Sequence, residues 1–421
     1  MTAVSRIQLW SAYLGNLFEH YDTALFGFLS PFLAPLIFPE KDPVTALILT
    51  YAIIPLGMLA RPFGSLVFGY IGDAYGRKHA LFLTLAGMSF VSGCIALSPT
   101  YLQAGILAPI IFFLGRVLQN FLAAGETMGG AIFLLENSSE RRHDLLSSFY
   151  SASTMGGYLL ASLGVFLLGH YNVVDPGWRF LYLCGCITGL FGCLIRRSPR
   201  TVQSTVQSSV KFSQTLVNLK SMFWTHRKPL LLIVISSGFA YATYSMALVL
   251  MNGFIPLVST FSKTEIMKIN TYLLVLDFCA LPFFGWIASK VSREKLMLSA
   301  SLGVVLFSMP LLLSLEGASL AGVIGVRVVF VIFGVAFFAP FHAWAQRLIP
   351  PDSRYGVISL GYALGSQLLG SPTAALALWC FQKTGMVSSV SWYWIALATA
   401  SSIAIAMTLR SRSEFKERHV A

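Results

Sequence analysis

Charged residues are scarce in this sequence of 421 residues. Lysine, arginine, aspartate and glutamate together make up 11% of it, against the roughly 25% that is usual for soluble domains. Hydrophobic residues make up 56% and aromatic residues 14%, and the mean hydropathy is +0.72. A soluble globule of this size needs a much more polar surface. The composition therefore argues against a cytosolic enzyme, a nucleic-acid-binding domain and a disordered regulator.

Cysteine is also scarce, with six residues in the chain. Most of them lie within apolar runs, and the Cys184-Gly-Cys186 spacing is not typical of metal ligands. We therefore expect buried thiols, with no disulfide framework, no metal site and no cofactor. The first ten residues carry one arginine and lead into a long apolar segment with acidic residues. This pattern predicts a retained first membrane span rather than a cleaved signal peptide.

Long apolar runs dominate the rest of the sequence. About 20 apolar residues cross the hydrocarbon core as a helix, because the backbone must satisfy its own hydrogen bonds there. Twelve such runs occur, at residues 9–38, 45–71, 80–98, 103–135, 146–170, 178–195, 229–256, 265–288, 296–315, 318–347, 355–381 and 392–409. The sequence therefore predicts an all-α, polytopic membrane protein. We expect two six-helix bundles, at 1–195 and 229–421, joined by a polar linker at 196–228.

Lysine and arginine are distributed unevenly between the connections. Most of the 29 basic residues fall in connections on one side, which include the linker and the C-terminal tail. Because basic connections remain in the cytoplasm, we predict that both termini and the linker are cytoplasmic. The same asymmetry accounts for most of the net charge of +12, so no nucleic-acid partner is needed to explain it.

The two halves of the sequence repeat some features. Arg61 in the second span and Asp277 in the eighth each precede a Pro-Phe pair and a glycine. Arg116 in the fourth span and Arg327 in the tenth each stand before a valine. Both pairs lie about half of the chain apart. Such repeats are typical of transporters with two related bundles and a substrate site between them.

Seven charged residues fall within the predicted spans, where an ionisable group is costly unless it is paired or faces water. They are Glu19, Asp22, Arg61, Arg116, Glu126, Asp277 and Arg327. Asp22 lies about 20 Å along the first span by the helical rise, near the midplane. Glu19 lies one turn earlier on the same face. Four acids and three bases leave one carboxylate without an arginine.

These charges have two interpretations. One is a static ion pair that fixes helix packing, and it applies to Asp22 with Arg116 and to the other charged residues. The second is a carboxylate that takes a proton from one compartment and releases it to the other, as its hydration changes. On the second interpretation, Asp22, Glu126 and Glu19 are the proton-coupling candidates. When Asp22 takes a proton, Arg116 loses its counter-charge and can bind a substrate carboxylate.

Other residues of the predicted spans are candidates for the cavity wall or for packing. Tyr21 and Tyr244 are candidates for the cavity wall, and His20 is expected to line the cavity rather than to carry protons. Glycines are expected to allow close helix packing, at Gly156, Gly157, Gly361, Gly365 and Gly370.

The connection between the second and third spans carries a specific motif. It reads Gly69-Tyr-Ile-Gly72-Asp73-Ala-Tyr-Gly76-Arg77-Lys78 and matches the signature G-x-x-x-D-x-x-G-R-K, so the chain resembles the major facilitator superfamily. The resemblance implies a cytoplasmic latch, formed by this loop with Asp73 and Arg77. Glu136 is the expected acidic partner of Arg77. The second-half copy keeps Gly285 and Arg293 but has Ser289 and Ser292 at the Asp and Gly positions.

Within that superfamily, the chain resembles the metabolite:proton symporters, which include proline/betaine, α-ketoglutarate, citrate and shikimate carriers. The resemblance covers most of the chain and is densest at 15–31, 61–64, 116–131 and 354–365. The sequence departs from that family at four places. His20 replaces a usual Trp, Asn120 replaces a Gly, residues 127–128 replace an aromatic, and Arg347 replaces an acid.

The resemblance implies a monomeric secondary transporter in a bacterial inner membrane. It would import a small carboxylate or zwitterionic metabolite by proton symport through alternating access. The substrate-binding candidates are Arg116, Tyr21, His20, Asn120, Arg61, Tyr244 and Arg327. The main alternative is a proton-coupled exporter of metabolites or drugs on the same fold. An ion channel would need a polar filter repeat, and a membrane enzyme would need a nucleophile–base pair or a metal cluster; we find none of these in the sequence. A receptor that does not transport can be distinguished only by a flux measurement.

Overall fold

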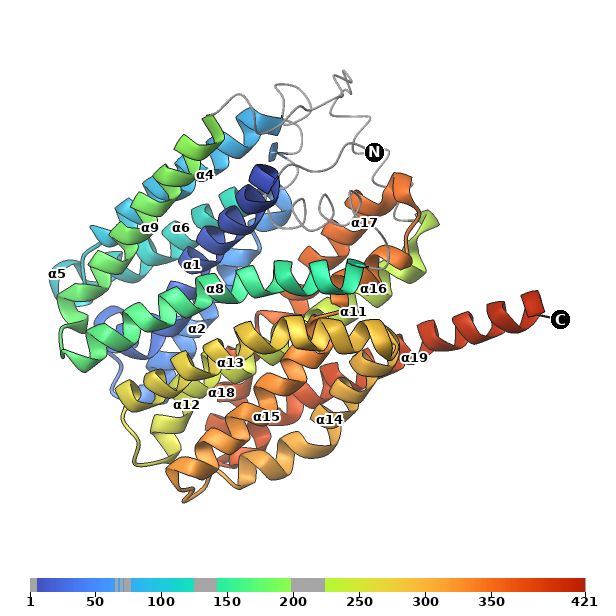
Figure 1. Cartoon of the computed structure of the whole chain (residues 1–421). Coiled ribbons are helices and arrows are strands. Elements are labelled where there is room, and N and C mark those ends of the chain that lie inside the picture. Colours follow the sequence, from blue (N-terminus) through green and yellow to red (C-terminus); the bar gives the residue numbers. More distant parts are fainter. Residues whose placement is uncertain are drawn as a thin grey trace. The chain divides into compact units, whose positions relative to one another are not determined.

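A computed structural model describes residues 6–64, 67–68, 71, 77–124, 142–197 and 224–420. Within these ranges every regular element is a helix (Figure 1). By its internal contacts the chain divides into two compact units. The first comprises Met1–Asn137, Ser153–Thr225 and Phe261–Val275, and the second comprises Ser138–Ala152, His226–Thr260 and Leu276–Ala421. The division into bundles at 1–195 and 229–421 stays a prediction.

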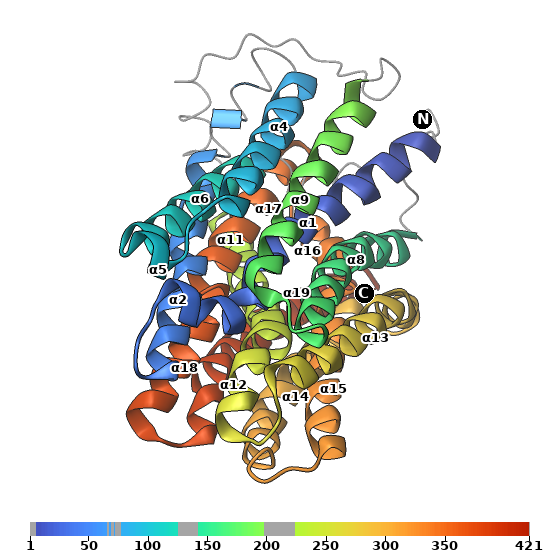
Figure 2. The ribbon, with the colours of Figure 1, turned by 90° about the vertical axis from the view of Figure 1, so that its left-hand side faces the viewer.

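The first unit contains most helices of the first half of the chain. They are α1 (Arg6–Ile37), α2 (Pro43–Met58), α4 (Arg77–Ala96), α5 (Tyr101–Ala104), α6 (Leu107–Ala123) and α9 (Val174–Arg197), with parts of α8 (His143–His170) and α13 (Lys263–Lys290). Helix α4 packs between α6 and α9, and α1 packs against α2 and α9 (Figures 1 and 2). Asp42 caps α2, because its carboxylate accepts hydrogen bonds from the backbone of Val44 and Thr45 at 3.1 Å.

The second unit contains the remaining helices and the other parts of α8 and α13. They are α11 (Arg227–Tyr244), the π-helix η2 (Ser245–Leu250), α12 (Met251–Val258), α14 (Arg293–Leu313), α15 (Leu320–Phe338), α16 (Phe341–Arg347), α17 (Pro351–Leu364), the π-helix η3 (Gly365–Gly370), α18 (Thr373–Thr384), the short 3₁₀ helix η4 (Val387–Ser391) and α19 (Trp392–Val420). Helix α11 packs against α17, η3 and α19, and α14 packs against α15 and α19. Two π-helices therefore interrupt otherwise α-helical spans, a feature often found near functional sites.

In chain order, these helices correspond to the twelve expected spans. The groups are α1, α2, α4, α6, α8, α9, α11 to α12, α13, α14, α15 to α16, α17 to α18, and α19. Seven helices of the described chain are long and apolar enough to cross a membrane, and two shorter apolar helices lie at Phe82–Ala96 and Leu107–Ala123. The prediction of an all-α, twelve-helix membrane protein is confirmed. The cytoplasmic position of the termini stays a prediction.

Large apolar side chains face outward on many of these helices. Phe90 on α4 is 71% exposed, and Phe63 is 67% exposed. Lipid favours such an apolar outer surface, which a soluble monomer of this size rarely shows. The prediction of buried thiols is wrong for the described cysteines, because Cys94 and Cys279 are exposed on α4 and α13 and Cys184, Cys186 and Cys380 are half-buried. A free thiol behaves as a small apolar group, so it can lie on a lipid-facing surface.

Glycines bring several helices into direct backbone contact. A Cβ atom at Gly157 would lie 2.2 Å from the carbonyl oxygen of Leu17, and one at Gly365 would lie 2.0 Å from that of Val234. At Gly361 and Gly370 the nearest side-chain atoms would lie at 2.8 and 2.6 Å. These distances are shorter than any real Cβ contact, so the predicted packing role of these four glycines is confirmed.

Candidate functional site

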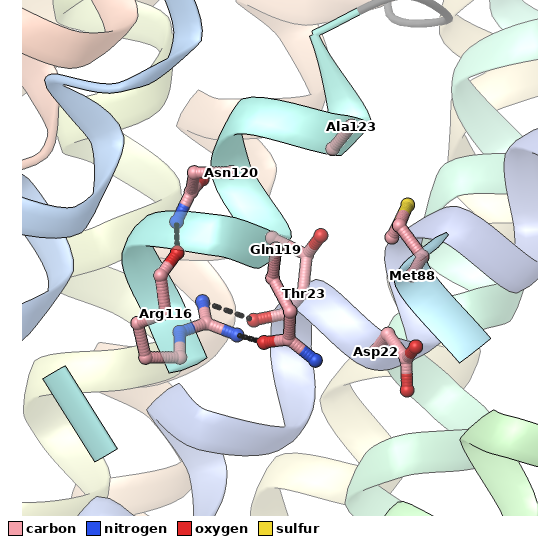
Figure 3. Close-up of a pocket in the computed structure, with 7 residues that line it drawn as sticks. All are labelled: Asp22, Thr23, Met88, Arg116, Gln119, Asn120 and Ala123. Carbon is pink, nitrogen blue, oxygen red and sulfur yellow. Dashed lines mark hydrogen bonds between the residues drawn. The ribbon is translucent and has the colours of Figure 1, made fainter. Parts of the chain in front are cut away.

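Four buried polar side chains of the first unit form a continuous network. Asp22 belongs to α1, Ser92 to α4, and Arg116 and Gln119 to α6. Nη1 of Arg116 donates a hydrogen bond to Oε1 of Gln119 at 2.8 Å (Figure 3). Nε2 of Gln119 donates to Oγ of Ser92 at 2.8 Å, and that hydroxyl donates to Oδ2 of Asp22 at 2.7 Å. Two neutral side chains therefore connect the carboxylate of Asp22 to the guanidinium of Arg116.

The guanidinium of Arg116 is held in place from several directions. Nη2 donates to the carbonyl oxygen of Thr23 at 3.4 Å, and the group lies 5.2 Å from the ring centroid of Phe26. Phe26 in turn contacts Phe112 with a centroid distance of 6.4 Å. An aromatic face attracts a cation, most strongly when water is excluded. The carbonyl of Thr23, the amide of Gln119 and the ring of Phe26 therefore help to orient Arg116.

A small pocket borders the network. Its empty volume is about 190 Å³, and it is lined by Asp22, Thr23, Met88, Arg116, Gln119, Asn120 and Ala123 (Figure 3). In this conformation the pocket reaches Asp22 and Arg116, but the space beside them is too narrow for a metabolite.

Arg61 and Asn120 belong to the same cluster. Nε of Arg61 donates to Oδ1 of Asn120 at 3.1 Å, and Nδ2 of Asn120 donates to the backbone oxygen of Arg116 at 2.8 Å. Both side chains are buried. Asn120 thus connects Arg61 to helix α6 next to Arg116, and the role of both residues in substrate binding stays a prediction.

The other candidates on α1 have structural partners outside the pocket lining. The Tyr21 hydroxyl donates to the backbone oxygen of Leu181 at 3.0 Å, which fixes α1 against α9. Nδ1 of His20 lies 2.7 Å from the backbone oxygen of Asn16, so this nitrogen carries a proton, because a carbonyl can only accept. Glu19 is buried one turn before Asp22.

Tyr244 and Arg327 belong to the second unit and have different partners. The Tyr244 hydroxyl donates to Oδ1 of Asp277 at 3.4 Å. Nη2 of Arg327 donates to Oδ1 of Asn252 at 3.0 Å and to the backbone oxygen of Ala247, in the π-helix η2, at 3.1 Å. Arg327 is fully buried, so a π-helix and an amide side chain stabilise its charge.

Several predicted residues lie outside the described part of the chain. These are Gly69, Asp73, Gly76, Glu126 and Glu136, and only the backbone of Arg77 is described, at the first residue of α4. Their roles in proton coupling and in the latch stay predictions.

One charged contact in the second unit was not predicted. Nε and Nη2 of Arg293 bind the two carboxylate oxygens of Asp144, with the Nη2–Oδ2 distance at 2.9 Å. Nη1 of Arg293 also donates to the backbone oxygen of Ala343 at 3.3 Å. Arg293 begins α14, and Asp144 lies in the first turn of α8. The retained arginine of the second-half motif pointed to this position, whereas no local pattern marks Asp144.

Ser92 and Gln119 were also missed. Both are neutral, so the search for charged residues inside the spans did not select them. Gln119 stands three residues after Arg116, a spacing that places two side chains on one helix face. That spacing is the signal that would have identified it.

Comparisons with known proteins agree with this fold. A family model described as "Sugar (and other) transporter" matches residues 9–202. A relative from Staphylococcus aureus (strain COL) is 28% identical over 93% of this chain and 85% of its own length. A relative from Escherichia coli (strain K12), named "Proline/betaine transporter", is 25% identical over 94% of this chain and 82% of its own length.

A solved structure of a D-xylose-proton symporter has the same fold. It superimposes with a TM-score of 0.73 at 15% identity, and the match covers 94% of this chain and 96% of that chain. These findings agree with the twelve helical spans, the apolar outer surface and the buried charged network, and they indicate a transporter rather than an enzyme. The chain is therefore similar to transporters of this fold along most of its length, and it is a multi-pass membrane transporter.

Proposed function

We propose that this transporter imports a small zwitterionic or anionic metabolite together with protons. The observation that carries the proposal is the buried network that connects Asp22 to Arg116 beside a pocket. An ionisable pair at this depth in a membrane protein is costly and typically marks a substrate or proton pathway. The Escherichia coli relative is named for proline and betaine, and both are small zwitterions with one carboxylate.

The proposed coupling is a competition for Arg116. While Asp22 is ionised, its negative charge attracts the guanidinium through Gln119 and Ser92. A proton on Asp22 removes that charge, and Arg116 then gains more from binding the carboxylate of a substrate. Proton and substrate therefore bind in the same state, and the protein acts as a monomer that alternates its access.

Closure on the cytoplasmic side is the second part of the proposal. The predicted latch consists of Asp73 and Arg77 with Glu136, and the pair of Arg293 and Asp144 is proposed as a second contact that holds the closed form. The arginine forms a bidentate contact with the carboxylate, which is among the stronger contacts that side chains make. Opening of this side requires both contacts to separate.

Transport into proteoliposomes tests the proposal. With an alkaline interior and an acidic exterior, we expect uphill accumulation of one of proline, glycine betaine, a dicarboxylate, citrate or a shikimate-like acid. Asp22→Asn should abolish the accumulation that the pH gradient drives but retain exchange of labelled for unlabelled substrate. Asp175→Asn, at an exposed carboxylate, is the matched control and should behave as the parent protein.

Two results would contradict the proposal. Full pH-driven accumulation by Asp22→Asn would exclude Asp22 as the coupling group. Transport that only an oppositely directed proton gradient drives would identify a proton-coupled exporter instead.

A further inference from the structure

The hydrogen bonds of the network can run in only one direction. A guanidinium has donors and no acceptor, so the amide oxygen of Gln119 must face Arg116. The amide nitrogen then faces Ser92 at 2.8 Å and donates to its hydroxyl oxygen. The Ser92 proton therefore points to Oδ2 of Asp22, at 2.7 Å. The charge of Arg116 thus fixes the orientation of every donor as far as the carboxylate.

The two oxygens of Asp22 consequently differ. Oδ2 accepts from Ser92, whereas Oδ1 is buried and has no hydrogen-bond partner among the described residues. Oδ1 faces helix α9 at Gly185, where a Cβ atom would lie only 1.9 Å from it and 2.9 Å from Cγ of Asp22. Any side chain at position 185 would therefore displace the carboxylate.

We propose that Ser92 and Gln119 are positioning residues that relay the charge of Arg116 to Oδ2 of Asp22, and that the coupling proton binds to Oδ1, the oxygen that lies against Gly185. The inference rests on the proposed function, because it specifies how Asp22 performs proton coupling. Both side chains are almost fully buried, and Gln119 also borders the pocket. In the relay they act through the two charged residues that they connect.

Other ionisable groups surround Asp22. The ionisable groups that lie near it or interact with it electrostatically are Glu19 and Tyr21 on α1, Arg116 on α6, Tyr182 and Cys186 on α9, and Cys94 on α4, which lies near Cys186. Arg116 is the one cation among these described groups. The relay is therefore the hydrogen-bonded route by which positive charge reaches the carboxylate.

The relay explains how coupling works without direct contact between Asp22 and Arg116. Hydrogen bonds in a chain polarise one another, most of all in a dry environment. An ionised Asp22 strengthens every bond back to Arg116, and a proton on Oδ1 weakens them all. Gln119 then holds Arg116 less tightly, and the guanidinium can turn to the substrate.

The pH dependence of uptake tests the relay. In Ser92→Ala the carboxylate loses a donor and retains its proton more readily, so half-maximal uptake should move to a higher external pH. We expect a shift of about one to two pH units for a hydrogen bond to a charged group. Ser92→Thr restores the hydroxyl and should return the profile toward that of the parent protein.

The matched control is Ser89→Ala, one turn earlier on α4. Ser89 is equally buried, but its hydroxyl donates to the backbone oxygen of Leu85 within its own helix. Gln119→Leu interrupts the same relay, so the double variant with Ser92→Ala should shift the profile less than the sum of the single variants. A parental profile for Ser92→Ala, or an equal shift in Ser89→Ala, would overturn the relay.

Infrared difference spectra between acidic and alkaline pH test which oxygen binds the proton. If Oδ1 carries it, Oδ2 is the carbonyl oxygen that accepts from Ser92. The carbonyl band that Asp22→Asn abolishes should therefore move to a higher wavenumber in Ser92→Ala and stay in place in Ser89→Ala. An unmoved band in Ser92→Ala would contradict the assignment to Oδ1.

Gly185 offers an independent test. Gly185→Ala should reduce pH-driven uptake and change the same carbonyl band, because the new methyl group displaces Asp22. Gly93→Ala is the control on the facing helix α4, since its Cβ would meet only Sγ of Cys186 at an ordinary 3.6 Å. Equal effects of the two variants would contradict the role of Gly185. If Asp22→Asn loses pH-driven uptake while Ser92→Ala keeps the parental pH profile, the relay is wrong and the proposed function stands. If Asp22→Asn keeps pH-driven uptake, both are wrong.

Discussion

Removal of the carboxylate charge at Asp144 is expected to destabilise the closed form that the contact between Asp144 and Arg293 is proposed to hold. In Asp144→Asn, Arg293 keeps its charge in a place where its side chain is 4% exposed. The acceptors that face it there, the amide oxygen of the new asparagine and the backbone oxygen of Ala343, are neutral. Breaking a buried pair by removing one partner costs about 3–5 kcal/mol. Since about 1.4 kcal/mol corresponds to a factor of ten, the closed form should lose roughly a hundredfold or more in relative population.

The matched control is the pair of Arg179 and Asp175. Its atoms lie 3.5 Å apart, and its side chains are 24% and 51% exposed. Exposed pairs contribute about 0.2–1 kcal/mol, so Asp175→Asn should change the measured quantities little. The comparison thus separates the effect of burial from the effect of charge removal.

Two measurements report the effect. Ser148 is buried next to Gly285, and Ser148→Cys in a cysteine-free background should react slowly with a maleimide. Adding Asp144→Asn should raise that labelling rate strongly, and thermal unfolding in detergent should begin at a lower temperature. The double variant Asp144→Arg with Arg293→Asp exchanges the two charges and should partly restore the slow labelling and the unfolding temperature. Labelling that is equal in Asp144→Asn and Asp175→Asn would refute the reasoning.

Three further outcomes follow from individual contacts. Arg116→Lys keeps the charge but loses the planar donors, so substrate uptake at low concentration should fall by about tenfold or more, as measured by initial rates, and a normal rate would contradict its role. Gly157→Ala should lower stability by about 1–3 kcal/mol through overpacking. Gly325→Ala should not, because a Cβ atom there would have no atom within 4 Å, and thermal unfolding of the two variants measures the difference. Asn252→Leu removes an acceptor of the buried Arg327 and should cost about 1–3 kcal/mol; an unchanged unfolding temperature would show that the contact is dispensable.

Much of the fold could be predicted because the membrane imposes local rules. A span must be long and apolar whatever its neighbours are, so the twelve spans follow from hydropathy alone. The same rule singled out Asp22, Arg116 and Arg327, since each charge is costly at that depth. The free-energy cost of placing a charge in the membrane depends on the residue type itself, so it can be recognised in the sequence. The packing glycines were predicted for a similar reason, because a missing side chain is a local property.

Contacts between helices depended on the tertiary structure. Apolar periodicity is weak in a helix that is surrounded by lipid and protein, so the rotation and depth of each helix are not encoded locally. Ser92 and Gln119 are neutral, so their presence in a span costs little free energy and does not mark them in the sequence. They nevertheless connect Asp22 to Arg116 across three helices. The hydrogen bond from the Tyr21 hydroxyl to the backbone of α9 likewise depends on helix packing, and the place of Tyr21 in a cavity wall stays a prediction. The sequence by itself thus determined which helices and charges exist, and only the packed helices decided which side chains meet, because partners distant in the chain are brought together by three-dimensional geometry alone.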